Sequence, residues 1–517
     1  MFTQTLGITL DGVDGLLVNV EVDVHPGLPM FSIVGLPDSS VRESKDRVRA
    51  AILNSGYDFP MQRITVNLAP ADNKKEGSCL DLAIAIGILV ATGQIPQQTE
   101  QMAIIGELSL DGTTRKTHGS LPQTIAAIQA GIRKLAISTD SIVELEMFQT
   151  YLDTIELVPV TSLAELANHM SGKQQIKINS RVLEPLKDDD IPIKMDLQDV
   201  RGQVLAKRAL EISAAGGHNL LLIGPPGCGK SMIANRIRGI LPKLTNQEAL
   251  HVNQLYSVAL PQIRSQRMLR ERPFRAPHHS ISIAGLVGGG VPPQPGEITL
   301  AHHGVLFLDE LPEFPKSTLD HLRQPLENGT ITISRARYQY TLPSMFQLLA
   351  AMNPCPCGFY QSANLCRCSL QQIKRYQSRI SGPLLDRFHM YIWMTPELGT
   401  TGQLDSPIDS SSSGESSATV RKRVEQAFEI QTKRNSDGFT NAMTGPESLS
   451  DWPIAANALD LWEQTTILRK LSARSREQVI RVARTIADLA ERNTIEMKDV
   501  AESLQYTDSA SLPLLYV

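Results

Sequence analysis

Alternating and helical spacings of hydrophobic residues divide the first third of the chain into strands and helices. Residues 13–24 and 64–68 alternate apolar and polar positions, as strands with one exposed face do. Residues 38–55 have helical spacing, and the nearly continuous apolar run 80–92 predicts a buried helix. Further predicted elements are a strand at 103–108, a helix at 124–131 that ends at a glycine, and a strand at 134–138. The pattern predicts a mixed α/β domain over residues 1–180.

Short, continuous apolar runs characterise the middle of the chain. Such runs are typical of strands that are buried on both faces of a parallel sheet, and they occur at 218–223, 305–308 and 346–352. Residues 205–215 before the first run and 232–237 after it have helical spacing. An α/β core is therefore predicted over residues 181–395.

The end of the chain changes character twice. Residues 396–418 contain the run SSSSGESS and predict a flexible, serine-rich linker. Beyond it, apolar stripes at helical spacing predict a helical domain over 419–517, with helices at 419–431, 456–467, 475–492 and 497–504.

Composition and charge limit the class of protein and its compartment but do not indicate a function. The 517 residues are 42% hydrophobic and 20% charged, which is ordinary for a soluble protein. A net charge of −4 means that any contact with nucleic acid must come from local basic patches. The N-terminus lacks the pattern of a signal peptide, and the apolar run 80–91 is too short to span a bilayer. We therefore expect a cytoplasmic protein without membrane contact, whose six cysteines are thiols or metal ligands.

A phosphate-binding loop follows the first apolar run of the core. The stretch matches G-x-x-x-x-G-K-[ST] between a predicted strand and a predicted helix, a frame that a chance glycine-rich turn seldom has. Backbone N–H groups of such a loop surround phosphates, the lysine reaches the β- and γ-phosphates, and the serine hydroxyl binds Mg²⁺. The predicted ATP-binding residues are Gly224, Pro225, Pro226, Gly227, Cys228, Gly229, Lys230, Ser231 and Met232.

Two carboxylates end the second apolar run. Asp309 would hold Mg²⁺ together with Ser231, and Glu310 would polarise the attacking water. With a helix and a glycine stop before the phosphate loop, this order resembles that of AAA+ ATPases. The resemblance implies three further roles, namely a water-orienting sensor, an arginine finger supplied to a neighbouring subunit, and a second sensor in the helical lid. It assigns them to Asn353, to Arg387 as first choice and Arg379 as second, and to Arg474. The alternative for either finger candidate is an arginine in a surface salt bridge.

Two inserted segments resemble the magnesium-chelatase and MCM-helicase branch of AAA+ proteins. One comprises residues 274–280 and 285–290, and the other is an alternating hairpin at 329–338. Arg335 and Arg337 have the same parity and are predicted to share one strand face, and Arg275 ends a basic stretch. The resemblance implies that these arginines grip DNA phosphates in the pore of a ring; the alternative is a solvated cationic ribbon. The histidine pairs 278–279 and 302–303 lack carboxylates at ligand spacing, so no metal site is predicted there.

Four cysteines lie within fourteen residues directly after Asn353. Two C-x-C pairs can converge on one tetrahedral Zn²⁺ as four thiolates, which leaves no open position for catalysis. We predict a structural zinc insert over residues 354–369, with free reduced thiols as the alternative; its ligands would be Cys355, Cys357, Cys366 and Cys368.

The N-terminal domain resembles the proteolytic domain of Lon proteases around residues 76–80 and 106–112. Ser78 falls at the position of the catalytic serine, but Leu121 falls where the family has its lysine base. A serine without a nearby base is a poor nucleophile. We therefore expect a Lon-like fold without peptidase chemistry, in which Ser78 caps a helix.

Taken together, these segments resemble the ComM/YifB family over nearly the whole chain. That resemblance implies a hexameric, ATP-driven DNA helicase that drives branch migration of single-stranded or branched DNA during natural transformation, with recombination proteins as further partners. Two alternatives stay open: a chelatase-type motor that remodels a protein partner, and an ATP-dependent peptidase, against which Leu121 argues.

Overall fold

The structure is a computed structural model, and its chain divides into two compact units. The first consists of Met1–Asp189 with Asn246–Leu269, and the second of Asp190–Thr245 with Arg270–Val517. The described residues are 1–72, 74–75, 77–97, 101–146, 148, 154–176, 195–259, 269–290, 294–335, 338–360, 365–395, 414–435 and 440–507.

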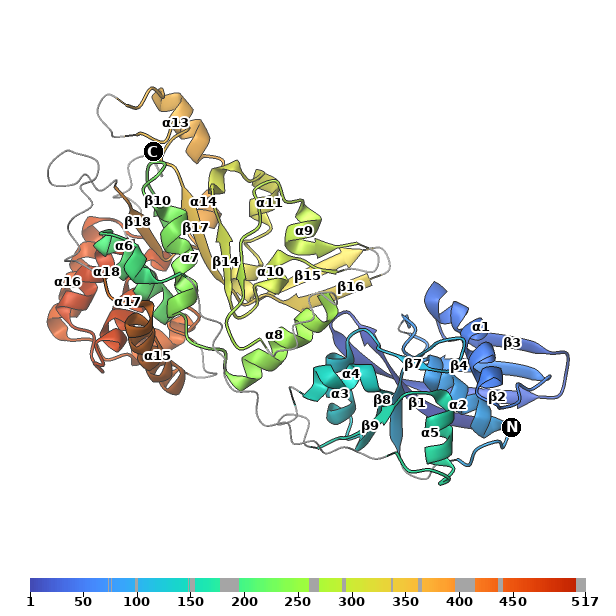
Figure 1. Ribbon diagram of the computed structural model, residues 1–517. Coiled ribbons are helices and arrows are strands. Elements are labelled where there is room, and N and C mark those ends of the chain that lie inside the picture. Colours follow the sequence, from blue (N-terminus) through green and yellow to red (C-terminus); the bar gives the residue numbers. More distant parts are fainter. Residues whose placement is uncertain are drawn as a thin grey trace. The chain divides into compact units, whose positions relative to one another are not determined.

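A seven-stranded sheet, in the order β3-β4-β2-β1-β5-β8-β9, forms the centre of the first unit (Figure 1). β1 pairs antiparallel with β2, and β2 with β4, whereas β5, β8 and β9 continue from β1 in parallel. Gly106 separates β5 from a short strand, β6, where the sequence predicted one strand. The strands are β1 (Phe2–Asp11), β2 (Asp14–His25), β3 (Met30–Val34), β4 (Arg63–Ala69), β5 (Met102–Ile105), β6 (Glu107–Leu108), β7 (Thr114–Arg115), β8 (Lys134–Ser138) and β9 (Glu156–Val160).

The helices of this unit pack on the sheet around a central apolar helix. α2 is buried along almost its whole length, as its continuous apolar sequence predicts. The helices are α1 (Ser39–Asn54), α2 (Asp81–Ala91), α3 (Ser120–Gln129), α4 (Thr139–Glu146) and α5 (Leu163–Met170).

One helix from the predicted motor region belongs to this first unit. This helix is α8 (Asn246–Ala259). Its Gln254 side chain donates a hydrogen bond to Asp14 at 2.8 Å, and its Ser257 hydroxyl donates one to Glu144 at 2.6 Å. The chain therefore leaves the motor after residue 245 and returns to it at residue 270. The boundaries 1–180, 181–395 and 419–517 stay a prediction, and both later domains fall largely within the second unit.

In the Lon-like domain, neither residue considered for the lysine base is placed as a partner of Ser78. Leu121 is buried in the core at 1% exposure, and Lys116 forms an ion pair with Glu144 at 2.8 Å. The predicted capping role of Ser78 is wrong, because Leu80 is the residue that precedes α2 and the Ser78 hydroxyl donates to Glu107.

Five parallel strands, in the order β11-β14-β17-β10-β18, form the sheet of the second unit. The three predicted apolar runs match β10, β14 and β17, which are fully buried, whereas β11 and β18 were not predicted. The strands are β10 (Leu220–Ile223), β11 (Phe274–Arg275), β14 (Val305–Leu308), β17 (Gln347–Met352) and β18 (Met390–Trp393). Short pairs are formed by β12 (Gly288–Gly289) with β13 (Gln294–Pro295) and by β15 (Thr330–Arg335) with β16 (Tyr338–Pro343).

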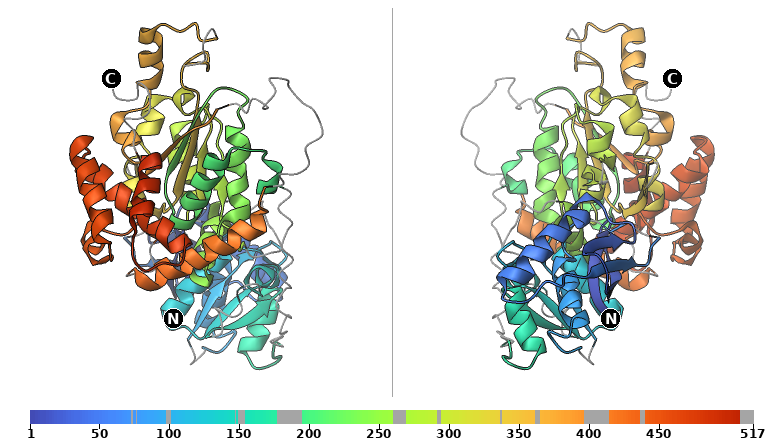
Figure 2. Two further views of the ribbon diagram at one scale, coloured as in Figure 1. Left: turned by 90° about the vertical axis from the view of Figure 1, so that its left-hand side faces the viewer. Right: turned by 90° about the vertical axis from the view of Figure 1, so that its right-hand side faces the viewer.

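Helices flank this sheet and continue into the predicted lid. Of the lid helices, α15 packs on α6 and α7, and α17 packs on α6 (Figure 2). The longer helices are α6 (Val204–Gly216), α7 (Lys230–Ile240), α13 (Leu370–Gln377), α15 (Ser417–Arg434), α16 (Ala456–Leu468), α17 (Ala473–Leu489) and α18 (Met497–Thr507). The shorter ones are α9 (Ile283–Val287), α10 (Glu297–Leu300), α11 (Lys316–Asp320), α12 (Pro325–Asn328) and α14 (Gly382–Leu385).

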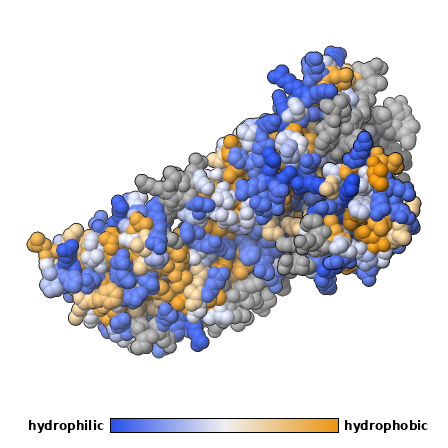
Figure 3. Space-filling model, turned by 180° about the vertical axis from the view of Figure 1, so that it is seen from behind, coloured by the Kyte–Doolittle hydropathy of each residue, from blue (hydrophilic) through white to orange (hydrophobic). Residues whose placement is uncertain are grey.

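Among the described residues, no helix is long and apolar enough to cross a membrane. On the face drawn in Figure 3, hydrophilic and hydrophobic residues are interspersed over both units.

A buried carboxylate joins the first two helices of the N-terminal unit. Asp81, at the start of α2, is fully buried and accepts from Arg47 of α1 at 2.7 Å and from the Ser44 hydroxyl. Burial raises the pKa of Asp81, and the bond from Arg47 acts in the opposite direction. The ion pair therefore compensates part of the cost of burying this charge.

We expect Arg47→Ala to lower the free energy of unfolding of the N-terminal unit by about 3–5 kcal/mol, because it leaves a buried charge unpaired. All three tryptophans lie beyond residue 390, so the measurement is amide hydrogen exchange of α2. Arg42→Ala, at an exposed position of α1, is the control. Equal protection of α2 in both variants would contradict the prediction.

Candidate functional site: a nucleotide site with a cysteine insert

The predicted nucleotide residues meet at the carboxyl edge of the parallel sheet. The phosphate loop follows β10, and Asn353 follows the adjacent strand β17. Nζ of Lys230 donates to the carbonyls of Gly224 and Pro225, both at 2.8 Å, and to Oδ1 of Asn353 at 3.0 Å. Burial lowers the pKa of Lys230, while the nearby Cys228 and Asp309 act to raise it. The structure therefore brings the predicted lysine and the predicted sensor into direct contact.

The two carboxylates at the end of β14 complete the group. Asp309 accepts a bond from the Ser231 hydroxyl, which joins the two predicted Mg²⁺ ligands. Glu310 has a φ of 52°, in the left-handed region that costs a non-glycine residue roughly 1–3 kcal/mol. Its side chain is 60% exposed, so the carboxylate can reach solvent. Oxygen ligands of this kind suit Mg²⁺, which would neutralise charge on the transferring phosphoryl group.

The four insert cysteines come together as the spacing predicts. All four sulfurs lie within 4.8 Å of one another, and the pairs Cys355–Cys357, Cys357–Cys366 and Cys355–Cys366 are 3.4, 3.6 and 3.9 Å apart. Thiolates at the corners of a tetrahedron around Zn²⁺ lie roughly 3.8 Å apart, given Zn–S bonds of about 2.3 Å. Although desolvation acts to raise it, bonds from the backbone of Phe359 and Arg367 lower the pKa of Cys357 to about 6. The donor set fits zinc.

The cysteine insert packs directly on the phosphate loop. Gly358, whose φ is +84°, approaches the loop so closely that a Cβ added to it would lie 2.4 Å from Cδ of Pro226. The side chain of Gln377, on α13, donates to the carbonyl of Pro354 at 2.9 Å and holds the start of the insert. The insert thus supports the loop from outside, a contact that the sequence did not predict.

The two finger candidates differ in accessibility. Arg387 is bound within its own subunit to Glu327 at 2.8 Å, and its side chain is only 10% exposed. Arg379 pairs with Glu313 at 2.9 Å but is 50% exposed.

The lid arginine lies with the finger segment. The pKa of Arg474 is lowered by burial and then by the nearby positive charge of Arg387, while Glu327 acts to raise it. The charges that act most strongly on Lys230 are instead those of Cys228, Asp309 and Glu310. Arg387 is therefore among the charges that lie near Arg474.

A buried polar group at the start of β10 supports this arginine pair, and the sequence analysis did not single it out. Asn219 donates to the Arg387 carbonyl at 2.8 Å and accepts from the Leu348 N–H at 2.7 Å. Nε2 of His218 lies 2.8 Å from the Thr485 hydroxyl on α17. Burial lowers the pKa of His218 and brings that of His389 to about 3, so both imidazoles are neutral. In the sequence, the only sign of this group was the pair of polar residues His218 and Asn219 at the start of an apolar run.

The predicted DNA-contacting arginines have different surroundings. Arg335 ends β15, where its backbone pairs with Tyr338, and Arg337 lies outside the described residues. The predicted shared strand face of the two arginines therefore stays a prediction. Arg275 lies on β11 of the sheet and binds Glu297 through two bonds of 2.6 and 2.7 Å, which is a role in the fold.

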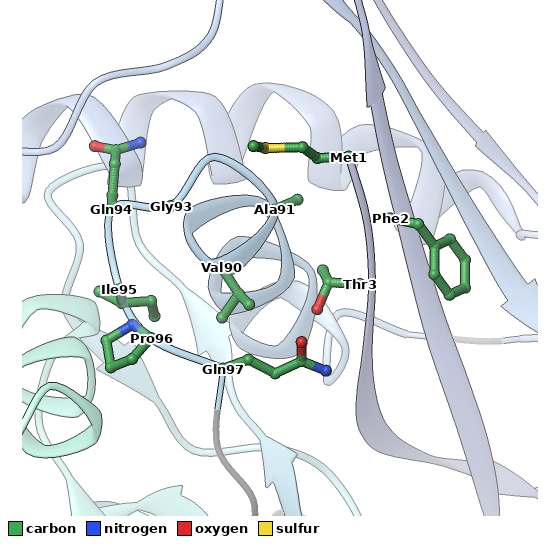
Figure 4. Close-up of a pocket in the computed structure, with 10 residues that line it drawn as sticks. All are labelled: Met1, Phe2, Thr3, Val90, Ala91, Gly93, Gln94, Ile95, Pro96 and Gln97. Atoms are coloured by element: carbon green, nitrogen blue, oxygen red, sulfur yellow. The ribbon is translucent and has the colours of Figure 1, made fainter.

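A separate pocket of about 520 Å³ lies in the first unit, between the start of β1 and the segment after α2 (Figure 4). Its lining supplies apolar side chains, the amides of Gln94 and Gln97 and the hydroxyl of Thr3. These groups include no acid–base side chain, so we assign no chemistry to the pocket.

Comparisons with known proteins agree with this geometry. Profiles described as magnesium chelatase subunit ChlI match residues 196–401 and 20–141, and the profile of its C-terminal part matches 414–507. YifB of Escherichia coli (strain K12) and the competence protein ComM of Haemophilus influenzae are each 42% identical to the chain, covering 96% of it and 95% of the relative. The chain belongs to the ComM/YifB family of magnesium-chelatase-like AAA+ proteins.

Membership of this family supports ATPase activity with ATP and Mg²⁺. The Lon-like character of the N-terminal domain is confirmed as well. An archaeal Lon protease of Methanothermobacter thermautotrophicus is 29% identical over 26% of the chain and 21% of its own length.

We expect Lys230→Ala to weaken nucleotide binding about ten- to a hundredfold, because it removes a charged donor to the phosphates. A fluorescent ATP analogue in the presence of Mg²⁺ measures the affinity. Lys433→Ala, which removes a lysine that is 78% exposed on α15, is the control. Equal affinity of the two variants would show that Lys230 does not contribute to nucleotide binding.

We expect the purified chain to hold about one Zn²⁺. The double variant Cys366→Ser/Cys368→Ser should lose it, whereas Cys79→Ala, at a buried cysteine of the other unit, should retain it. Elemental analysis gives the metal content, and less than half an equivalent in the wild type would count against the site.

Proposed function

We propose that the protein is an ATP-driven motor of the helicase type that acts on single-stranded or branched DNA as a ring of six subunits. The name of the Haemophilus influenzae relative, competence protein ComM, favours a role in integrating incoming DNA during natural transformation. Recombination proteins would then be partners.

The observation that carries the proposal is the packing of two inserted segments in the motor unit. A Cβ at Gly288, in β12, would lie 2.7 Å from Cδ1 of Ile333 in β15, so the first insert contacts the hairpin directly. The first strand of the hairpin ends at Arg335, and Arg337 follows two residues later in the sequence. Arginines suit contacts with phosphates, which need charge and no particular base.

In the ring, the nucleotide site would be completed by a neighbouring subunit. Lys230 and the loop N–H groups would hold the phosphates, and Glu310 would accept a proton from the attacking water. Between the two finger candidates, the exposure of Arg379 now favours it, because Arg387 would first have to leave Glu327. Since Arg474 lies beside Arg387, both arginines would belong to the same side of a subunit contact.

The family description also suits a chelatase-type motor that remodels a protein partner. Such a function would not need the basic hairpins. A normal ring whose ATPase rate does not respond to DNA would favour that function.

We expect single-stranded or forked DNA to raise the ATPase rate of the wild type. Arg335→Ala should weaken the stimulation and reduce the log–log salt slope by about 1 for each engaged subunit, and Lys230→Ala should abolish activity. Lys422→Ala, which removes an exposed lysine of α15, is the matched control. Titration of DNA at several salt concentrations measures both quantities.

A further inference from the structure

The cysteine insert is joined to the nucleotide site in two ways, by the chain itself and by a packing contact. Asn353, which accepts from Nζ of Lys230 at 3.0 Å, stands two residues before the first insert cysteine. Gly358, which lies between the two cysteine pairs, packs against the ring of Pro226 in the phosphate loop. Two routes therefore lead from the cysteines to the loop, one through the backbone to Asn353 and one through Gly358.

The turn that carries the first cysteine pair also positions the glycine. The N–H of Gly358 donates to the carbonyl of Cys355 at 2.9 Å, so Cys355 and Cys357 lie within the same turn as Gly358. The φ of Gly358 is +84°, which other residues rarely adopt, and its approach to Pro226 leaves no room for a Cβ. A metal ligated by Cys355 and Cys357 would therefore fix the surface on which Pro226 rests.

Metal binding adds a constraint that the free thiols do not provide. A Zn²⁺ held by all four thiolates would link the two cysteine pairs and close a segment of fourteen residues. The binding free energy of such a metal stabilises the folded form of its site. Without the metal, the hydrogen bonds made by Gly358 and Gln377 remain, but the two cysteine pairs are no longer joined to each other.

The phosphate loop depends on its contacts for its shape. Gly227 and Gly229 have φ of 78° and 89°, and glycine restricts the backbone less than any other residue. Pro226, which precedes them, is the loop residue that meets Gly358. A displaced turn would therefore change the positions of the backbone N–H groups that surround the phosphates.

We propose that the cysteine insert is an allosteric metal site, in which Zn²⁺ on the four cysteines and nucleotide on the phosphate loop each raise the affinity for the other. The metal-bound insert holds Gly358 against Pro226, and the metal-free insert lets the turn leave the loop. Thermodynamic linkage requires the two affinities to change by the same factor. The coupling rests on the zinc and nucleotide sites described above and does not involve DNA.

The test measures the affinity of the full chain for a fluorescent ATP analogue with Mg²⁺, before and after a zinc-selective chelator removes the metal under reducing conditions. We expect the zinc-free protein to bind the analogue about five- to tenfold more weakly, and added Zn²⁺ should restore the affinity. Competition with a chromophoric chelator gives the affinity for Zn²⁺, which a non-hydrolysable ATP analogue should raise by the same factor. Lys230→Ala is the control, since an effect that persists there comes from binding of Zn²⁺ by the nucleotide itself.

Gly358→Ala separates the packing contact from the metal. This variant keeps all four cysteines, but its Cβ would collide with Pro226. We expect it to hold about one Zn²⁺, to bind nucleotide as weakly as the zinc-free wild type, and to show no further change when zinc is removed. Gly56→Ala is the matched control, because Gly56 has a φ of +81° and a Cβ there would meet no atom within 4 Å.

Equal nucleotide affinity of the zinc-loaded and zinc-free wild type would overturn the proposal, and so would a full response to zinc in Gly358→Ala. Circular dichroism verifies that each form is folded. If the zinc-free chain is unfolded, the nucleotide affinities of zinc-loaded Gly358→Ala and Gly56→Ala decide the question, and equal values contradict the coupling. If Gly358→Ala does not hold zinc, Pro226→Ala replaces it, and a response to zinc as large as that of the wild type contradicts the coupling.

Discussion

The nucleotide site depends on one constraint, the parallel direction of the five strands in the motor sheet. Parallel strands end at one edge, so the loops that follow them must meet there. This is why the loop after β10 meets the residues that follow β17 and β14. Lys230 bonds to Asn353, 123 residues away, and Ser231 bonds to Asp309, 78 residues away. Any change that reversed a strand would disperse the site.

The opposite ends of the same strands serve a different purpose. Asn219, before β10, links the backbone of Arg387 to β17, and His218 links the sheet to the lid helix α17. These groups are buried and neutral, so their hydrogen bonds act in a medium where an unpaired polar group is costly. The lid and the finger segment are thus fixed relative to the nucleotide edge through the sheet itself.

The N-terminal unit keeps the core of its fold without the catalytic pair. Leu121 contributes to the apolar core, and the hydroxyl of Ser78 is bound to Glu107. The unit also holds α8, which the chain reaches by leaving the motor and returning to it. The chain therefore passes between the two units after residues 189, 245 and 269, and they are connected by more than one linker.

The sequence by itself predicted the three strands that carry the candidate nucleotide site and the residues of that site. Local spacing fixes buried strands and helices, and the residues of a phosphate loop must be contiguous to surround a phosphate. The same holds for the cysteine pairs, whose sulfurs converge as expected. Only the tertiary structure decided that Gly358 supports Pro226, that Arg387 is buried against Glu327 and that His279 reaches Glu310. These contacts join segments far apart in the chain, and packing, which leaves no periodic trace in a sequence, decides them.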